Sequence, residues 1–394
     1  MKKLTFKPFA ALALTVSLIA CQKNELIKTS GKEFDLDLFE ENIKKALADK
    51  TIGFSYSISQ NGVQKRKGAD GAAVASWDSR SGAEIAHAPV KRQDLASCSK
   101  TYTALTVMRL LQEKKLTHKE LLIDYLPSFW KKPAWSFNEI TLGMLMNHTS
   151  GLIDGWLDYS ALKQKTEGGG IFLHGGYKYV NANYAFLRVA IAYLSHESDL
   201  KKLENTYLKN PSNASEKALE TAINDYYIEQ VNQKVFAKCG IPYTYPKPDG
   251  EMNPTMNYNF NTKDPGWNKG DMTLHAGSAG WRLSSEEQNK ILAHLKYTTN
   301  ILNETWKKRM NDSLYGWSGT QKLAGGTAYY HGGYFEDKYG PNDAPTPKGR
   351  GCYTVHIVFG NNVEAAVQSN SLGGLSTNME GIVIPAFNNA WVEK

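Results

Sequence analysis

The chain is poor in cysteine, with four in 394 residues, so a small disulfide-stapled scaffold is excluded. Its nine histidines show no spacing typical of a zinc site, and we expect no metal and no cofactor. The sequence also lacks runs of lysine and arginine interleaved with aromatics, and its net charge of +7 is too small to indicate a nucleic-acid partner. What remains is an ordinary globular composition, 41% hydrophobic and 22% charged, long enough for one large domain or two packed ones.

The N-terminus predicts an exported chain. A basic start precedes an apolar stretch, residues 8–20, which is too short to span a bilayer and is typical of a signal peptide. It ends in Leu-Ile-Ala-Cys at residues 18–21, which resembles a bacterial lipobox. We therefore expect a lipoprotein signal peptide over 1–20 and a tether over 21–34. A lipidated Cys21 would anchor the protein to a membrane of the cell envelope, facing the periplasm or the cell surface. The alternative is an ordinary signal peptide with an incidental cysteine.

Strand patterns occur near both ends of the chain. Residues 54–68 alternate around an Asn-Gly pair, which predicts a β-hairpin. Residues 353–359 and 363–368 alternate in the same way, and a final helix is expected over about 379–391. Between the two ends the apolar spacing is helical. The expected fold class is α+β: an antiparallel sheet built from both chain termini and flanked by helices, with an inserted all-helical lobe.

This pattern predicts one domain over residues 35–394. The sheet lobe would take about 35–94 and 275–394, and the helical lobe about 95–274. A functional site is expected in a cleft between the lobes. Residues 240–277 are rich in Gly, Pro and Asn, and they form either a lip over that cleft or a surface loop pinned by aromatics.

Three short motifs supply reactive side chains. Ser97-x-x-Lys100 places a hydroxyl and an amine on one side of a helix, where a desolvated lysine can accept the serine proton. Tyr179-x-Asn181 adds a phenol that can carry a proton and an amide that can hold a substrate carbonyl. His331-Gly-Gly lies on a strand whose glycines permit close approach of a substrate. Each motif alone has a structural alternative: a helix cap, aromatic packing or a loose edge strand. Together they are the parts of a serine acyl-transfer enzyme without a Ser-His-Asp triad.

With these motifs in this order, the sequence resembles the penicillin-recognising serine hydrolases related to class C β-lactamases and serine-type D-alanyl-D-alanine carboxypeptidases. The resemblance runs from about residue 50 to the C-terminus and implies the β-lactamase/transpeptidase-like fold. The segments that carry it are residues 97–104, 140–152, 179–184, 279–280 and 331–333.

The resemblance also implies roles for the motif residues. Ser97 would be the acylated nucleophile and Lys100 would take its proton. Tyr179 would pass a proton to the leaving group, and Asn181 would orient the substrate amide. His331 would stand where β-lactamases carry a lysine.

The strand after His331 is expected to hold the substrate. The backbone N–H groups of Ser97 and Tyr334 would form the oxyanion hole, and Gly332, Gly333 and Tyr334 would line the bound substrate. Two departures from β-lactamases matter here: the motif is His-Gly-Gly rather than Lys-Thr-Gly, and the bulky Tyr334 replaces a small hydroxyl residue that helps to bind the substrate carboxylate. His148 falls in a family segment that is structural, so it is not assigned to the catalytic set.

The leading hypothesis is a lipid-anchored serine hydrolase that cleaves an amide or ester through an acyl-enzyme on Ser97. Peptides with D-residues, such as cell-wall fragments, are favoured as substrates in a carboxypeptidase-like reaction. The same site would also suit a β-lactamase or a carboxylesterase. The alternative of another class is a non-catalytic receptor that binds cell-wall peptides or β-lactams.

Overall fold

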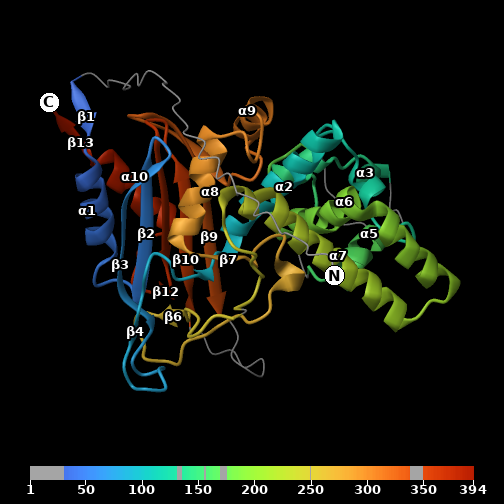
Figure 1. Cartoon of the computed structure of the whole chain (residues 1–394), viewed down its shortest axis with the longest axis horizontal. Helices are drawn as coiled ribbons and strands as arrows, with labels where there is room; N and C mark the ends of the chain where they lie inside the picture. The colour runs from blue at the N-terminus through green and yellow to red at the C-terminus, as the bar shows by residue number, and fades with distance from the viewer. Residues whose placement is uncertain (1–30, 131–134, 155–156, 169–174, 249, 338–348) are drawn as a thin grey trace, which may run out of the picture.

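The computed structural model describes residues 31–394 apart from 131–134, 155–156, 169–174, 249 and 338–348 (Figure 1). The expected signal peptide and Cys21 lie outside the described residues. Residues 32–34 of the expected tether form strand β1 (Lys32–Phe34), which pairs with β13 (Trp391–Glu393). The last part of that segment therefore belongs to the folded domain, which corrects the expected boundary. No helix in the described ranges is long and apolar enough to cross a membrane.

A mixed set of long and short strands builds the main sheet. Its long strands are β2 (Gly53–Gln60), β3 (Val63–Val74), β9 (Gly326–Asp337), β10 (Arg350–Val358) and β11 (Val363–Ser369). Its short strands are β4 (Ile85–Ala86), β6 (Tyr258–Asn259), β8 (Gly319–Leu323) and β12 (Ser371–Leu372). The antiparallel order is β8-β9-β10-β11-β2-β3-β4, with β6 and β12 beside the start of β10. Strands from the two ends of the chain meet where β11 pairs with β2, which confirms the expected sheet.

Helices cover both faces of this sheet. The helices are α1 (Leu36–Leu47), α2 (Ser99–Lys114), α3 (Trp135–Asn138), α4 (Leu142–Met146), α5 (Tyr159–Gly168), α6 (Asn181–Lys209), α7 (Asn213–Val231), α8 (Ser285–Tyr297), α9 (Glu304–Ser313) and α10 (Met379–Asn388). Shorter turns are η1 (Ala96–Cys98), η2 (Leu122–Tyr125), η3 (Asn232–Phe236), η4 (Ala237–Cys239) and η5 (Thr273–His275). Helices α1 and α10 pack on one face, where their apolar side chains and those of β2 form a core. Helix α8 packs on the other face, against β2 and β11.

The hairpin turn between β2 and β3 follows the local sequence. Asn61 and Gly62 have φ values of 53° and 75°, which are the left-handed conformations that a two-residue primed turn requires. The final helix is shorter than expected, because α10 ends at Asn388 and the chain then continues into β13. Pairing with β1, which is far away in the sequence, competes with helix formation at that point.

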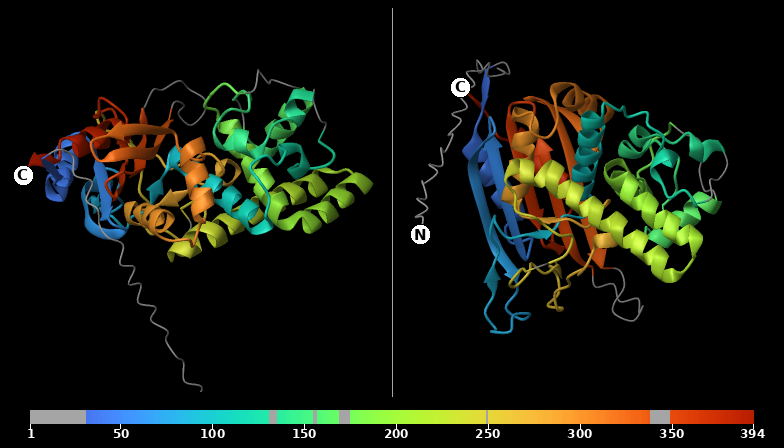
Figure 2. Two further views of the ribbon diagram at one scale, coloured as in Figure 1. Left: turned by 90° about the horizontal axis from the view of Figure 1, so that it is seen from above. Right: turned by 45° about the vertical axis from the view of Figure 1, so that its right-hand side comes forward.

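A second, larger core holds the helical lobe together. Helices α2, α4, α6 and α7 contribute about half of its side chains, and the lobe lies at one side of the sheet (Figure 2). Helix α2 is buried along its first three turns, because it runs between the sheet and this lobe. Its N-terminal turn is therefore placed at the junction of the two lobes.

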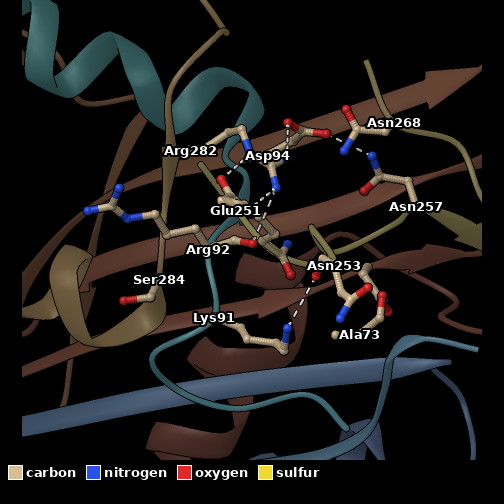
Figure 3. A network of polar contacts seen from close by, with 12 residues as sticks. Ala73, Lys91, Arg92, Asp94, Glu251, Asn253, Asn257, Asn268, Arg282 and Ser284 are labelled. Atoms are coloured by element: carbon tan, nitrogen blue, oxygen red, sulfur yellow. Dashed lines mark hydrogen bonds and ion pairs between the residues drawn. The ribbon is translucent and has the colours of Figure 1, made fainter. Parts of the chain in front are cut away.

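The segment that was expected to be a lip or a surface loop is anchored by a buried ion network (Figure 3). Arg282 of β7 (Arg282–Leu283) contacts Asp94 of β5 (Gln93–Asp94) at 2.7 Å and Glu251 at 2.9 Å. The side-chain amide of Asn257 donates to the other oxygen of Asp94 at 2.8 Å. The segment is thus tied to the strand that immediately precedes the Ser97 motif.

The three cysteines that the structure describes are Cys98, Cys239 and Cys352. All three are buried and carry free thiols.

Candidate active site

Ser97 lies on a strained turn at the start of α2. Ala96, which precedes it, has φ of 49°, a left-handed conformation that is unusual for a residue with a side chain. The turn is held by the N–H of Leu95, which donates to the carbonyl of Trp281 at 3.0 Å. Ser97 remains partly exposed although Ala96 and Cys98 on either side are buried. The turn therefore presents the hydroxyl and buries its neighbours.

Lys100 is one helical turn further along and is completely buried. Its ammonium nitrogen lies 3.0 Å from Ser97 Oγ, 2.8 Å from Asn181 Oδ1 and 2.8 Å from the carbonyl oxygen of Ser278. Burial lowers the pKa of Lys100 to about 7, although Asp154 acts in the opposite direction. Asn181 Oδ1 and the Ser278 carbonyl can only accept hydrogen bonds, whereas the Ser97 hydroxyl can donate one. A neutral Lys100 therefore satisfies all three contacts when its lone pair faces Ser97.

Asn181 is the first residue of α6 and is held by Asp154. Its side-chain nitrogen donates to Asp154 Oδ2 at 3.2 Å, and its backbone N–H donates to Asp154 Oδ1 at 3.0 Å. The N–H of Ala182 also donates to Oδ1, at 3.3 Å. A carboxylate at this position caps the N-terminus of a helix, where the backbone N–H groups lack partners within the helix.

Tyr179 lies beside both Ser97 and Lys100. Lys100 Nζ is 4.9 Å from the centre of the Tyr179 ring. Desolvation raises the pKa of the Tyr179 phenol, and a hydrogen bond with Ser97 partly offsets this. The phenol is therefore protonated at neutral pH and lies within reach of the serine oxygen.

His148 supports Tyr179 from behind. The two rings stack with centroids 4.4 Å apart. His148 Nδ1 accepts hydrogen bonds from the side chain of Asn183 at 3.0 Å and from the N–H of Val180 at 3.3 Å. Burial and the nearby Lys100 lower the pKa of His148 to about 3, so the ring is neutral.

The His-Gly-Gly motif lies on β9, against the Ser97 turn. A side chain on Gly333 would collide with the carbonyl of Leu95 and with Thr354, so only glycine lets the turn approach the strand so closely. Strand β8 pairs with residues 326–330 of β9. The edge of β9 after Tyr330 is therefore not covered by β8, and it faces the Ser97 turn. The N–H of Gly332 donates toward this edge, to Ser318 Oγ at 3.2 Å. Since alternate N–H groups of a strand point the same way, the N–H of Tyr334 also faces this edge.

His331 does not supply a positive charge. It is buried, and its Nδ1 lies 2.8 Å from the carbonyl of Gly332. Its ring centroid is 6.3 Å from that of Tyr179. Burial, then the positive charge of Lys100, holds the pKa of His331 well below its usual range. The structure thus brings His331 to the site as a neutral ring beside the phenol, unlike the lysine of β-lactamases.

Carboxylates flank the position of Tyr334. Its hydroxyl donates to Glu336 at 2.5 Å, and the residue is 45% exposed. A Cβ atom on Gly332 would lie 2.5 Å from Glu380 Oε2, so this carboxylate lies where a side chain of residue 332 would be. The side chain of Phe335 points to the other face of the strand, with Lys269 Nζ 3.4 Å from its ring centre. The carboxyl groups of Glu336 and Glu380 therefore lie on the face of β9 that carries residues 332 and 334.

Sequence reasoning assigned no role to Asp154 or Ser278, and it placed His148 only in a structural segment. Asp154 and His148 both fall in or next to the segment 140–152 that carried part of the resemblance. Their closeness in sequence to this segment was the one signal that could have pointed to them. Their contacts with the motif residues depend on how segments far apart in the chain pack together. Among the residues that the structure describes, no group of three or more His, Cys, Asp or Glu side chains could hold a metal ion.

The partly exposed Ser97 hydroxyl lies within hydrogen-bonding reach of a buried amine of lowered pKa and of a protonated phenol. Two backbone N–H groups adjoin them, one at a helix start and one on a strand edge. Such a site is typical of a serine acyl-transfer hydrolase.

The comparison with known protein families agrees with this class. The model of the Beta-lactamase family matches residues 39–377, and the chain belongs to that family. No curated protein shows significant sequence similarity to the chain.

Solved structures resemble the chain in fold at low identity. A penicillin-binding protein homologue from Pyrococcus abyssi has 16% identity and a TM-score of 0.64, with 89% of this chain and 76% of that chain covered. A β-lactamase/D-alanine carboxypeptidase from Pseudomonas syringae has 16% identity and a TM-score of 0.62, with 89% and 97% covered. A D-amino acid amidase from Ochrobactrum anthropi has 14% identity and a TM-score of 0.63, with 90% and 98% covered.

Proposed function

We propose that this protein hydrolyses an amide or ester bond of a D-amino-acid compound through an acyl-enzyme on Ser97. The observation that carries the proposal is the set of three contacts around Lys100 Nζ, in which two partners accept only and the third is the Ser97 hydroxyl. This arrangement leaves the lone pair of a neutral amine one partner, the Ser97 hydroxyl, from which it accepts a hydrogen bond and can take the proton.

Acylation then follows from the geometry. The Ser97 proton moves to Lys100 Nζ while Ser97 Oγ attacks the substrate carbonyl carbon. The carbonyl oxygen becomes negatively charged and is stabilised by the N–H groups of Ser97 and Tyr334. When the bond to the leaving group breaks, Tyr179 gives its proton to the departing amine or alcohol and is reprotonated from Lys100.

Deacylation runs the same groups in reverse. A water molecule attacks the acyl carbon and loses a proton through Tyr179 to Lys100. The ester bond to Ser97 then breaks, the serine oxygen regains a proton, and the acid product leaves. Asn181 accepts a hydrogen bond from Lys100 through its side-chain oxygen, and it holds the amine in position during both acylation and deacylation.

The charges beside the strand favour one group of substrates. Glu336 and Glu380 flank Gly332 and Tyr334, and His331 is neutral, so a free carboxylate at this position is disfavoured. D-amino acid amides and D-peptides with a neutral leaving group fit this environment better than β-lactams do. The names of the structural neighbours include a D-amino acid amidase and a D-stereospecific amidohydrolase, which supports the D-configuration.

The test combines covalent labelling with a substrate panel. A fluorophosphonate or acyl-ester probe is expected to label Ser97 in the folded protein, as read by peptide mass spectrometry, and Ser97→Ala abolishes the label. Tyr179→Phe lowers turnover by at least about 100-fold, because loss of a proton carrier commonly costs 10²–10⁴-fold.

The panel pairs D-Ala-D-Ala with its C-terminal amide and adds a p-nitrophenyl ester and a chromogenic cephalosporin. We expect faster turnover of the amide than of the acid, and little or none of the cephalosporin. Efficient cephalosporin turnover would identify a β-lactamase instead, and labelling without turnover of any member would identify a receptor. Absence of any label on Ser97 would remove the proposal.

We further propose that the protein is a lipoprotein of the bacterial cell envelope, anchored through Cys21. The support is the Leu-Ile-Ala-Cys sequence after a short apolar stretch at the N-terminus. Mass spectrometry of the mature N-terminal peptide decides this, since an unmodified Cys21 would contradict the anchor.

A further inference from the structure

We propose that Asp154 is a positioning residue for the Lys100 base and acts through the side-chain amide of Asn181. The inference rests on the proposed function, because it concerns how the base of that reaction is held. Asp154 touches neither Ser97 nor Lys100 in any hydrogen bond that the described residues form, so its effect on the nucleophile is indirect.

The two carboxylate oxygens of Asp154 have different partners. Oδ1 accepts from the backbone N–H groups of Asn181 and Ala182, at 3.0 and 3.3 Å, and so caps α6. Oδ2 accepts from Asn181 Nδ2 at 3.2 Å. A residue that served only as a helix cap would need the first pair of bonds but not the bond to the side chain.

The bond to the side chain decides which way the Asn181 amide faces. A carboxylate accepts only, so it selects the NH₂ end of the amide and turns the oxygen toward Lys100, which lies 2.8 Å away. If the amide were reversed, its NH₂ group would face the N–H groups of Lys100. The lysine would then lose one of the two acceptors that direct its lone pair to Ser97.

The backbone around Asp154 is itself held in place. Lys165 of α5 donates to the carbonyl of Asp154 at 3.1 Å and lies 3.4 Å from the carbonyl of Ile153. The carboxylate is exposed to solvent, while the amine that it acts on is completely buried. The Asn181 amide is thus the link between a surface charge and a buried base.

Asp154 also differs from the other groups around Lys100 by its charge. His148 and His331 are neutral because burial and Lys100 itself lower their pKa values. Desolvation keeps Cys98, Tyr179 and Tyr184 protonated by raising their pKa values. Asp154 is the carboxylate that raises the pKa of Lys100 against the effect of burial. Its removal should therefore move the titration of the base to lower pH.

The experiment measures kcat/KM against pH with a p-nitrophenyl ester, normalised to the Ser97 sites that a probe titrates. Asp154→Ala is expected to lower kcat/KM about 100-fold, as a misplaced catalytic group commonly does. Asp154→Asn, which keeps the shape of the side chain, is expected to shift the acidic limb of the profile to lower pH. Asp158→Asn is the matched control: it removes the same charge from a nearby helix cap, where Asp158 accepts from the N–H of Ala161 at 2.9 Å. This control should leave rate and limb unchanged.

A double-mutant cycle with Asn181→Ala tests the indirect route. If Asp154 acts through Asn181, the two single losses do not add, and the double variant is little worse than Asn181→Ala alone. Additive losses, or an Asp154→Asn profile identical to that of the unmodified protein, would overturn the inference. Normalising kcat/KM to the labelled Ser97 sites separates a positioning role from a loss of stability. If Asp154 only capped the helix for folding, its substitution would reduce the number of labelled sites and would leave the acidic limb of the pH profile in place. If the unmodified protein is not labelled at all, the proposed function fails and the inference fails with it.

Discussion

A lysine is destabilised in its charged form when it is buried, and at Lys100 this desolvation favours the neutral amine that can act as a base. With no exposed surface, the ammonium form loses hydration that its three polar contacts replace only in part. The result is an amine whose pKa falls to about 7, near the pH at which a general base works best. The same burial lowers the pKa values of His331 and His148, so both rings are weaker bases than Lys100 and do not compete with it for the serine proton.

The first prediction at this scale concerns pH. Only the neutral form of Lys100 can take the serine proton, and its pKa is about 7 rather than 10.5. The rate of Ser97 acylation should therefore rise with pH through a single limb centred near 7 and level off above it. The raised pKa of Tyr179 adds no descending limb in the neutral range.

Stopped-flow acylation by a p-nitrophenyl ester between pH 5 and 9.5, corrected for spontaneous hydrolysis, measures the limb. Lys100→Arg, which stays charged, should remove the limb together with most of the rate. A profile that still climbs steeply at pH 9 would mean that Lys100 is not the base.

The sequence motifs predicted the residues of the candidate site but not the residues that hold them in place. The helical spacing of Ser97 and Lys100 is local, so the pattern alone places both on one side of a turn. The bonds from Asp154 to Asn181 and from Lys100 to the Ser278 carbonyl join segments far apart in the chain. Such contacts follow from tertiary packing, which no local pattern encodes.

At the scale of elements, the site depends on how closely η1 approaches β9. Gly333 faces the turn and Gly332 faces Glu380, on opposite sides of the strand. On the turn side of the contact, Ala96 adopts a left-handed φ. The strained turn and the absence of a side chain at Gly333 together permit the close approach. In the proposed mechanism, this contact would align the N–H groups of Ser97 and Tyr334.

Gly333→Ala tests that contact. The new methyl group would overlap the Leu95 carbonyl and Thr354, neither of which is the end of a flexible chain, so the turn must move away from the strand. We expect kcat to fall by about 100-fold or more, since removing one oxyanion donor costs on the order of 10²–10³.

Gly176→Ala is the matched control, because a Cβ atom there meets nothing within 4 Å. Steady-state kinetics with the ester substrate, together with thermal denaturation of each variant, separates catalysis from folding. Full activity in a folded Gly333→Ala protein would show that the close approach is dispensable.

Elements were predicted best where the local sequence decides them. The Asn61-Gly62 turn, for example, follows a short-range rule. The end of α10 was predicted too late, because residues 391–393 pair with β1, more than 350 positions earlier. A periodic pattern cannot reveal that a distant strand competes for the same residues.

At the scale of the whole molecule, distant parts of the chain meet around the Ser97 turn. Strand β5 pairs with β7, and the residue after β5, Leu95, is bonded to Trp281. The buried pair of Asp94 and Arg282 closes this junction and ties in Glu251 from the long segment before β7. The sequence indicated the sheet and the inserted helices but not this junction, since a buried ion pair leaves no periodic signal.

Breaking that junction should cost far more than breaking a surface pair. Arg282→Met keeps the length of the side chain but leaves Asp94, 4% exposed, without its cation. The expected loss is about 3–5 kcal/mol of unfolding free energy, the usual result of leaving a buried charge uncompensated. Lys308→Met removes the exposed pair with Asp312, where the partners are 77% and 58% exposed, and should change stability by less than about 0.5 kcal/mol.

Urea denaturation of both variants, with Asp94→Asn in the Arg282→Met background, completes the comparison. The double variant should recover part of the loss, because the carboxylate that lacked a partner is then neutral. Equal, small effects of Arg282→Met and Lys308→Met would show that the junction does not stabilise the fold. The same junction positions the turn that carries Ser97. Acylation of Ser97 by the probe should therefore decline in Arg282→Met together with the unfolding free energy, and it should recover in part when Asp94→Asn is added.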